Sequence, residues 1–137
     1  MNNKNDINSK FQFMSEVISA ECFHSLFKEF IEEESLITEQ KQIELLDVLG
    51  EKFVKFYNIH ELKENERKFI SDRLIKLTHF SDINRISELI GLMFSFVDKT
   101  YYEFLLNSLE TKQLSYEVQK EITESTKEFK KTYFNIL

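Results

Sequence analysis

The chain has 137 residues, no proline, two glycines, one cysteine and a formal net charge of −6. Because turn-rich β folds and phosphate-binding loops depend on glycine and proline, this composition excludes both classes. A single cysteine also excludes an intramolecular disulfide. The length suits one hydrophobic core, and we predict a single domain over residues 1–137, in which residues 1–8 are frayed.

The first part of the chain predicts two amphipathic helices. From residue 9 to residue 33, apolar residues form two lines at helical spacing, which is typical of a helix that contacts two neighbours. A second helix is expected over residues 39–57, where apolar residues define a buried side and Glu44, Asp47 and Glu51 share another face. Residues 35–38 are expected to connect the two helices.

Residues 58–80 predict a third helix with two alternative starts. Asn58 and Glu61 have the spacing of a capping box, in which two side chains accept bonds from each other's backbone N–H groups. The helix therefore begins at Ile59 or, after a break, near Asn65. We expect it to end around residue 79 or 80.

The most apolar stretch predicts one long helix over residues 83–106. Apolar residues recur there at helical spacing, and between residues 89 and 97 they surround the helix, so we expect it at the centre of the fold. Ser115 can cap a last helix that extends to about Asn135. Together these segments predict an all-α bundle of about five helices, largely antiparallel because the connections are short.

The chain carries no feature that directs it to a membrane. Its first residues lack the apolar core of a signal peptide, and the apolar stretch of residues 89–97 is about half as long as a membrane-spanning helix. We therefore expect a cytoplasmic protein.

The charge is distributed unevenly along the chain. Residues 16–51 contain ten acidic and two basic residues, whereas the remainder contains sixteen basic and fourteen acidic residues. Phosphate binding needs clustered lysine and arginine, so direct binding of nucleic acid is not expected. Basic residues between positions 63 and 85 alternate with acidic ones, which is typical of a solvated surface of mixed charge. The acidic segment instead favours a basic protein as the partner.

The acidic segment supplies the candidate binding residues. Four glutamates lie at the carboxyl end of the first helix, where the helix dipole disfavours negative charge, and three acids follow on one face of the second helix. The predicted partner-binding residues are Glu29, Glu32, Glu33, Glu34, Glu44, Asp47 and Glu51. An immunity protein or antitoxin-like inhibitor of a bacterial nuclease toxin has this character, because a nuclease carries a positive cleft for phosphates. The oligomeric state stays open.

Glu21 and His24 suggest a metal site, but the pattern is incomplete. Their spacing places both side chains on one helical face, as in the glutamate and histidine pairs of di-iron bundles. Such bundles need a second pair and two further glutamates, and neither His60 nor His79 has a glutamate three residues before it. We predict no metal and no cofactor, with His24 as a partly buried structural residue.

Enzymatic chemistry is not expected either. Cys22 and His24 project about 200° apart on a helix, so they cannot pair as nucleophile and base. No known catalytic motif is present, and we predict that the protein is not an enzyme. The alternative is a regulatory module that binds a small apolar ligand among the phenylalanines or forms a dimer through the first helix.

Overall fold

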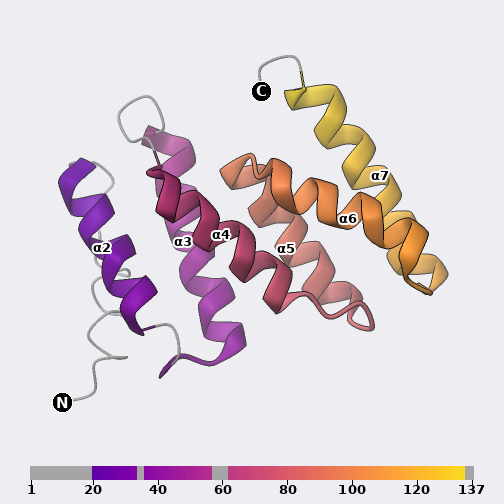
Figure 1. The fold of residues 1–137 in the computed structure, drawn as a ribbon, viewed down its shortest axis with the longest axis horizontal. Helices are drawn as coiled ribbons and strands as arrows, with labels where there is room; N and C mark the ends of the chain where they lie inside the picture. The colour runs from indigo at the N-terminus through magenta and orange to yellow at the C-terminus, as the bar shows by residue number, and fades with distance from the viewer. Residues whose placement is uncertain (1–19, 34–35, 57–61, 135–137) are drawn as a thin grey trace. The chain divides into compact units, whose positions relative to one another are not determined.

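The computed structural model describes residues 20–33, 36–56 and 62–134. These residues form six helices and no strand (Figure 1), so the prediction of an all-α fold is confirmed. The helices are α2 (Ala20–Glu33), α3 (Glu39–Phe56), α4 (Glu64–Leu77), α5 (Ile83–Phe96), α6 (Lys99–Thr111) and α7 (Tyr116–Tyr133). None of the helices in this part of the chain is both long and apolar enough to cross a membrane.

The chain divides into two compact units, residues 1–69 and residues 70–137. The first unit contains α2, α3 and the start of α4, and the second contains the rest of α4 together with α5, α6 and α7. The boundary falls inside α4, which is continuous. Whether the two units form one domain stays a prediction, and residues 1–8, predicted to be frayed, lie outside the described residues.

Phenylalanine rings form much of the core of the first unit. Phe27 and Phe30 of α2 are fully buried and meet the ring of Phe69 edge-on, at centroid distances of 5.9 and 5.6 Å. Burying each ring stabilises the fold by about 2 kcal/mol, and edge-on pairing adds to this. From α3, Leu46 and Leu49 are also fully buried. The apolar spacing of α3 therefore identified its buried side correctly, whereas on α2 the fully buried Phe30 lies in neither of the two predicted apolar lines.

Two local hydrogen bonds fix the chain directly before α3. Lys41 N donates to Thr38 Oγ1 at 3.3 Å, a contact typical of a helix N-cap. Gln42 is buried and its Nε2 donates to the carbonyl of Ile37 at 2.9 Å. The expected start of the second helix at Glu39 is therefore confirmed.

The predicted helix over residues 83–106 is wrong, because the chain breaks at Val97 and Asp98. Val97 adopts the left-handed conformation with φ 49° and ψ 56°, and the Asp98 N–H returns to the carbonyl of Met93 at 2.9 Å. The Asp98 carboxylate then accepts a bond from Tyr101 N at 3.0 Å and so begins α6. Apolar spacing indicates which side chains are buried, but it does not show whether the backbone stays helical between them. The same spacing can therefore continue across a break between two helices.

Asp98 also connects the segment between α5 and α6 to α4 through a hydrogen bond. Its side chain is buried, and the hydroxyl of Ser71 donates to its two carboxylate oxygens at 3.0 and 2.9 Å. Nearby, the buried phenol of Tyr101 is hydrogen-bonded to Thr78 at 2.8 Å. Burial raises the pKa of Tyr101 above its usual range, so the phenol stays neutral in the folded protein.

The last helix lies where the sequence predicts it. Ser115 Oγ accepts from Val118 N at 3.3 Å, which confirms the predicted N-cap. Helix α7 packs against α5 and α6, and its fully buried Phe129 contacts Phe94, Tyr102 and Tyr133. This aromatic cluster fixes α7 within the second unit.

Replacing Gly91 with alanine is expected to stabilise the protein by about 0.5–1 kcal/mol. Gly91 lies inside α5, is exposed, and has no atom within 4 Å of the position that a Cβ would occupy. The added methyl group therefore costs no packing, while the loss of glycine's backbone freedom lowers the entropy of the unfolded chain. Urea unfolding measures the difference. A destabilised variant would show that the exposed face of α5 is covered in solution.

Candidate functional site

The acidic face of α3 is formed by the exposed side chains of Glu44, Asp47 and Glu51. At 100° per residue, these positions fall within an arc of about 60° and extend over about 10 Å of helix. Leu46 and Leu49, which are fully buried, lie on the other side of α3. Lys41 Nζ lies 3.7 Å from Glu44 Oε2, but the Glu44 side chain is still 56% exposed. The helix therefore presents several carboxylates to solvent together.

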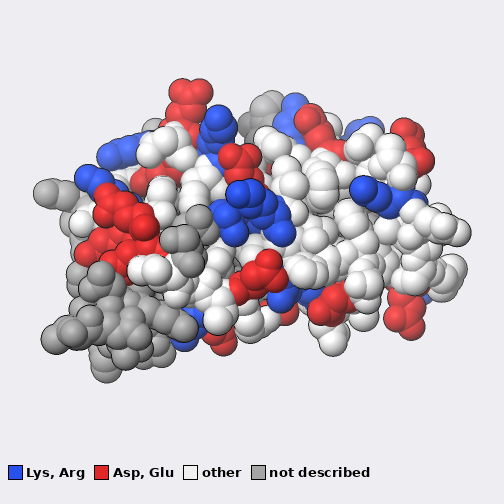
Figure 2. Space-filling view, turned by 60° about the horizontal axis from the view of Figure 1, so that its bottom comes forward, with Lys and Arg blue, Asp and Glu red and all other residues white. Residues whose placement is uncertain are grey.

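The predicted glutamates of α2 do not share one environment. Glu32 is exposed, whereas Glu29 and Glu33 are half-buried, and Glu34 lies outside the described residues. One carboxylate oxygen of Glu33 is buried and has no hydrogen-bond partner within the described part of the chain. Figure 2 shows acidic side chains gathered over α2. Among the α2 glutamates with described side chains, Glu32 is thus the best placed to meet a partner.

His24 and Glu66 form a polar contact that links α2 to α4. The His24 Nδ1 lies 2.9 and 2.8 Å from the two carboxylate oxygens of Glu66, and because a carboxylate only accepts, the imidazole is the donor. Lys63 N donates to Glu66 Oε1 at 2.8 Å, so Glu66 also caps the start of α4. The side chains of His24 and Glu66 are only 16% and 4% exposed. The expectation of a partly buried, structural His24 is therefore confirmed.

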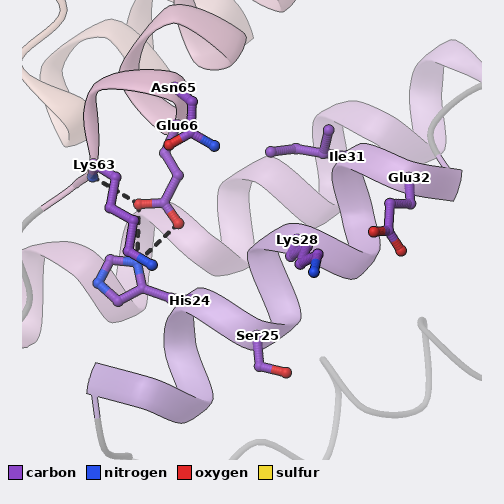
Figure 3. A pocket seen from close by; sticks show the side chains of 8 residues that line it. All are labelled: His24, Ser25, Lys28, Ile31, Glu32, Lys63, Asn65 and Glu66. Carbon is purple, nitrogen blue, oxygen red and sulfur yellow. Dashed lines mark hydrogen bonds and ion pairs between the residues drawn. The ribbon is translucent and has the colours of Figure 1, made fainter.

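A groove of about 510 Å³ lies beside this contact, within the first unit. Figure 3 shows that α2 supplies one side of the groove and the start of α4 the other. The lining residues are His24, Ser25, Lys28, Ile31, Glu32, Lys63, Asn65 and Glu66. Seven of these eight residues, all except Ile31, carry a polar or charged group, and the apolar parts of their side chains also line the groove.

The described residues contain no group of three or more His, Cys, Asp or Glu side chains arranged to hold a metal ion. His24 instead meets Glu66, which is 42 positions later in the chain. The side chains of Glu21 and Cys22 lie outside the described residues, so the pairing of either with His24 stays untested.

The sequence did not reveal Glu66 as a residue of this site. Glu66 follows Lys63 by three residues, which is the spacing of half a capping box, but lysine is not a capping residue. The only sequence feature that pointed to Glu66 was therefore a glutamate in the first helical turn. This feature is too common to identify a particular residue. The alternative capping pair, Asn58 and Glu61, lies outside the described residues, while the alternative start near Asn65 agrees with α4 beginning at Glu64.

The contact between His24 and Glu66 is expected to contribute a coupling free energy of about 1–2 kcal/mol. Removing either side chain deprives the other, mostly buried side chain of this bond. The sum of the two single losses in unfolding free energy should therefore exceed the loss in the double variant. A double-mutant cycle of His24→Ala and Glu66→Ala, measured by urea unfolding, gives this energy. Glu66→Ala paired with Glu103→Ala, a variant of an exposed residue of the second unit, is the additive control. Additive losses in the His24 cycle would contradict the assignment.

Comparison with known proteins gives no relative for this chain. No protein-family model, no curated protein and no solved structure matches it.

Proposed function

We propose that the first unit is a binding module for a basic protein partner, and that the acidic face of α3 is its main contact surface. The observation that supports this proposal is the exposure of Glu44, Asp47 and Glu51 on one helical face. Glu32 of α2 is a secondary contact. The concrete function is that of an immunity protein or antitoxin-like inhibitor, which covers the positive cleft of a nuclease toxin.

The physical effect of such a face is mainly on the rate of association. Exposed ion pairs contribute about 0.2–1 kcal/mol each, so three contacts alone do not make a tight complex. A cluster of like charges, however, attracts an oppositely charged partner over about 8–10 Å in physiological salt. Complementary surfaces of this kind raise association rates by factors of about 10 to 1,000. An inhibitor that must reach its toxin before the toxin reaches nucleic acid needs such a rate.

The test uses the proteins encoded by the genes beside this one, each expressed alone and with this chain. We expect one neighbour to be basic, to stop growth when expressed alone, and to be harmless in the presence of this chain. The triple variant Glu44→Lys, Asp47→Lys and Glu51→Lys should lose protection and associate at least tenfold more slowly, as measured by stopped-flow or surface plasmon resonance. The rate for the wild type should fall steeply as salt rises.

The matched control is Glu103→Lys, Glu110→Lys and Glu124→Lys. These glutamates are exposed on α6 and α7 of the second unit, so the control changes the net charge equally but leaves the α3 face intact. It should protect cells and associate within about threefold of the wild type, because these exposed charges lie outside the proposed contact surface and are screened by salt. Thermal melting curves of both triple variants serve to check that each one folds. Equal loss in both variants would assign the effect to net charge, and full protection by the α3 variant would refute the proposed surface.

A further inference from the structure

We propose that the groove between α2 and the start of α4 binds a small anionic molecule, whose phosphate or carboxylate group lies between Lys28 and Lys63. This site is separate from the acidic face of α3 and does not depend on the function proposed for that face. The residues that carry the inference are Lys28, Lys63, Asn65, Glu66 and Ile31.

The groove is large enough to hold a small molecule. Its volume of about 510 Å³ falls within the range of about 300–1,000 Å³ that is common for small-molecule sites. Both walls belong to the first unit, and the hydrogen bonds between His24 of α2 and Glu66 of α4 connect them. The contact therefore holds the two walls of the groove together before a ligand arrives.

The groove offers positive charge to a ligand. Lys28 and Lys63 are exposed, and neither ammonium group has an ion pair or a hydrogen bond within the described residues. The Glu66 carboxylate accepts from His24 and from the backbone of Lys63, so its charge is already partly compensated. The two cations are therefore available to an anion from outside.

The N-terminus of α4 lies at the groove. Its first N–H groups have no helical acceptor and the positive end of its dipole faces its own start, where Lys63 and Asn65 line the groove. The Asn65 side chain adds an amide that can donate a hydrogen bond. Figure 3 shows Lys63, Asn65 and Glu66 at one side of the groove and Glu32 at the far end of α2 from His24. The end near Lys63 thus favours an anion.

The other residues that line the groove restrict the size, polarity and charge of the part of the ligand that lies beyond its anionic group. Ile31 supplies an apolar wall, and Glu32 repels a second negative charge at its end of the groove. The groove therefore fits a molecule with one anionic group and a short apolar body. A free phosphate ester and a carboxylic acid share this chemistry.

The test is a titration of the full chain followed by NMR of its backbone amides. Phenyl phosphate and hexanoate are the two probes, and inorganic phosphate and acetate are the corresponding anions without an apolar body. We expect saturable shifts of the amides of residues 63–66 with a Kd below about 10 mM for at least one probe. If phenyl phosphate alone gives saturable shifts, the site is a phosphate site. If hexanoate alone does so, it is a carboxylate site.

Charge variants make the test specific. Lys28→Gln with Lys63→Gln should raise the Kd at least tenfold, whereas Lys127→Gln with Lys130→Gln, two exposed lysines of α7, should leave it unchanged. Glu32→Gln should lower the Kd about twofold, because it removes a repulsive charge that is partly screened by solvent. The absence of saturable shifts with both probes, an equal effect of both lysine pairs, or weaker binding by Glu32→Gln would overturn the proposal.

Discussion

Replacing Phe129 with alanine is expected to lower the free energy of unfolding by about 3–5 kcal/mol. Phe129 is fully buried in α7 and its ring lies 5.6 Å from that of Phe94 and 5.1 Å from those of Tyr102 and Tyr133. The substitution removes the hydrophobic contribution of the ring, leaves a cavity and ends several ring contacts at once. Chemical denaturation with circular dichroism measures the loss.

Two further variants identify the cause of this loss. Phe129→Leu keeps most of the buried volume and should cost about 1–1.5 kcal/mol. Phe80→Ala removes a half-buried ring that stacks on Phe104, so it should cost less than Phe129→Ala. Hydrogen exchange should also become faster along α7 in the Phe129→Ala protein. A loss below about 1 kcal/mol would mean that α7 is not held by this cluster.

Replacing Asp98 with alanine is expected to lower the free energy of unfolding by about 3 kcal/mol. The carboxylate caps α6 through Tyr101 N, and the loss of an N-cap costs about 1 kcal/mol. It also accepts from the buried hydroxyl of Ser71, and an unsatisfied buried donor costs a further 1–3 kcal/mol or so. Thermal and urea unfolding both report this difference.

Asp82 provides the matched control for Asp98. It caps α5 by accepting from Arg85 N at 3.1 Å, but it is exposed. Asp82→Ala should therefore cost only the cap, about 1 kcal/mol. Asp98→Asn keeps an acceptor for Tyr101 N and should cost less than Asp98→Ala. Equal losses in the two alanine variants would show that the bond between Ser71 and Asp98 contributes nothing.

The candidate surfaces differ in how far the sequence could reveal them. The acidic face of α3 was predictable, because helical spacing alone places Glu44, Asp47 and Glu51 together once the helix is known. The groove was not, because its two walls come from α2 and from the start of α4, and no local pattern pairs His24 with Glu66. A glutamate in the first turn of a helix usually faces solvent, whereas Glu66 is buried.

The sequence by itself determined the helical class, the buried side of α3 and the cap at Ser115. These features depend on residues within one or two helical turns of each other, so local spacing specifies them. Only the tertiary structure decided the break at Val97 and Asp98 and the contact between His24 and Glu66. At this break the Asp98 carboxylate caps α6 and also accepts from the buried hydroxyl of Ser71, which lies 27 positions earlier. The bond to Ser71 depends on a partner that is distant in the chain, and no periodic pattern records it.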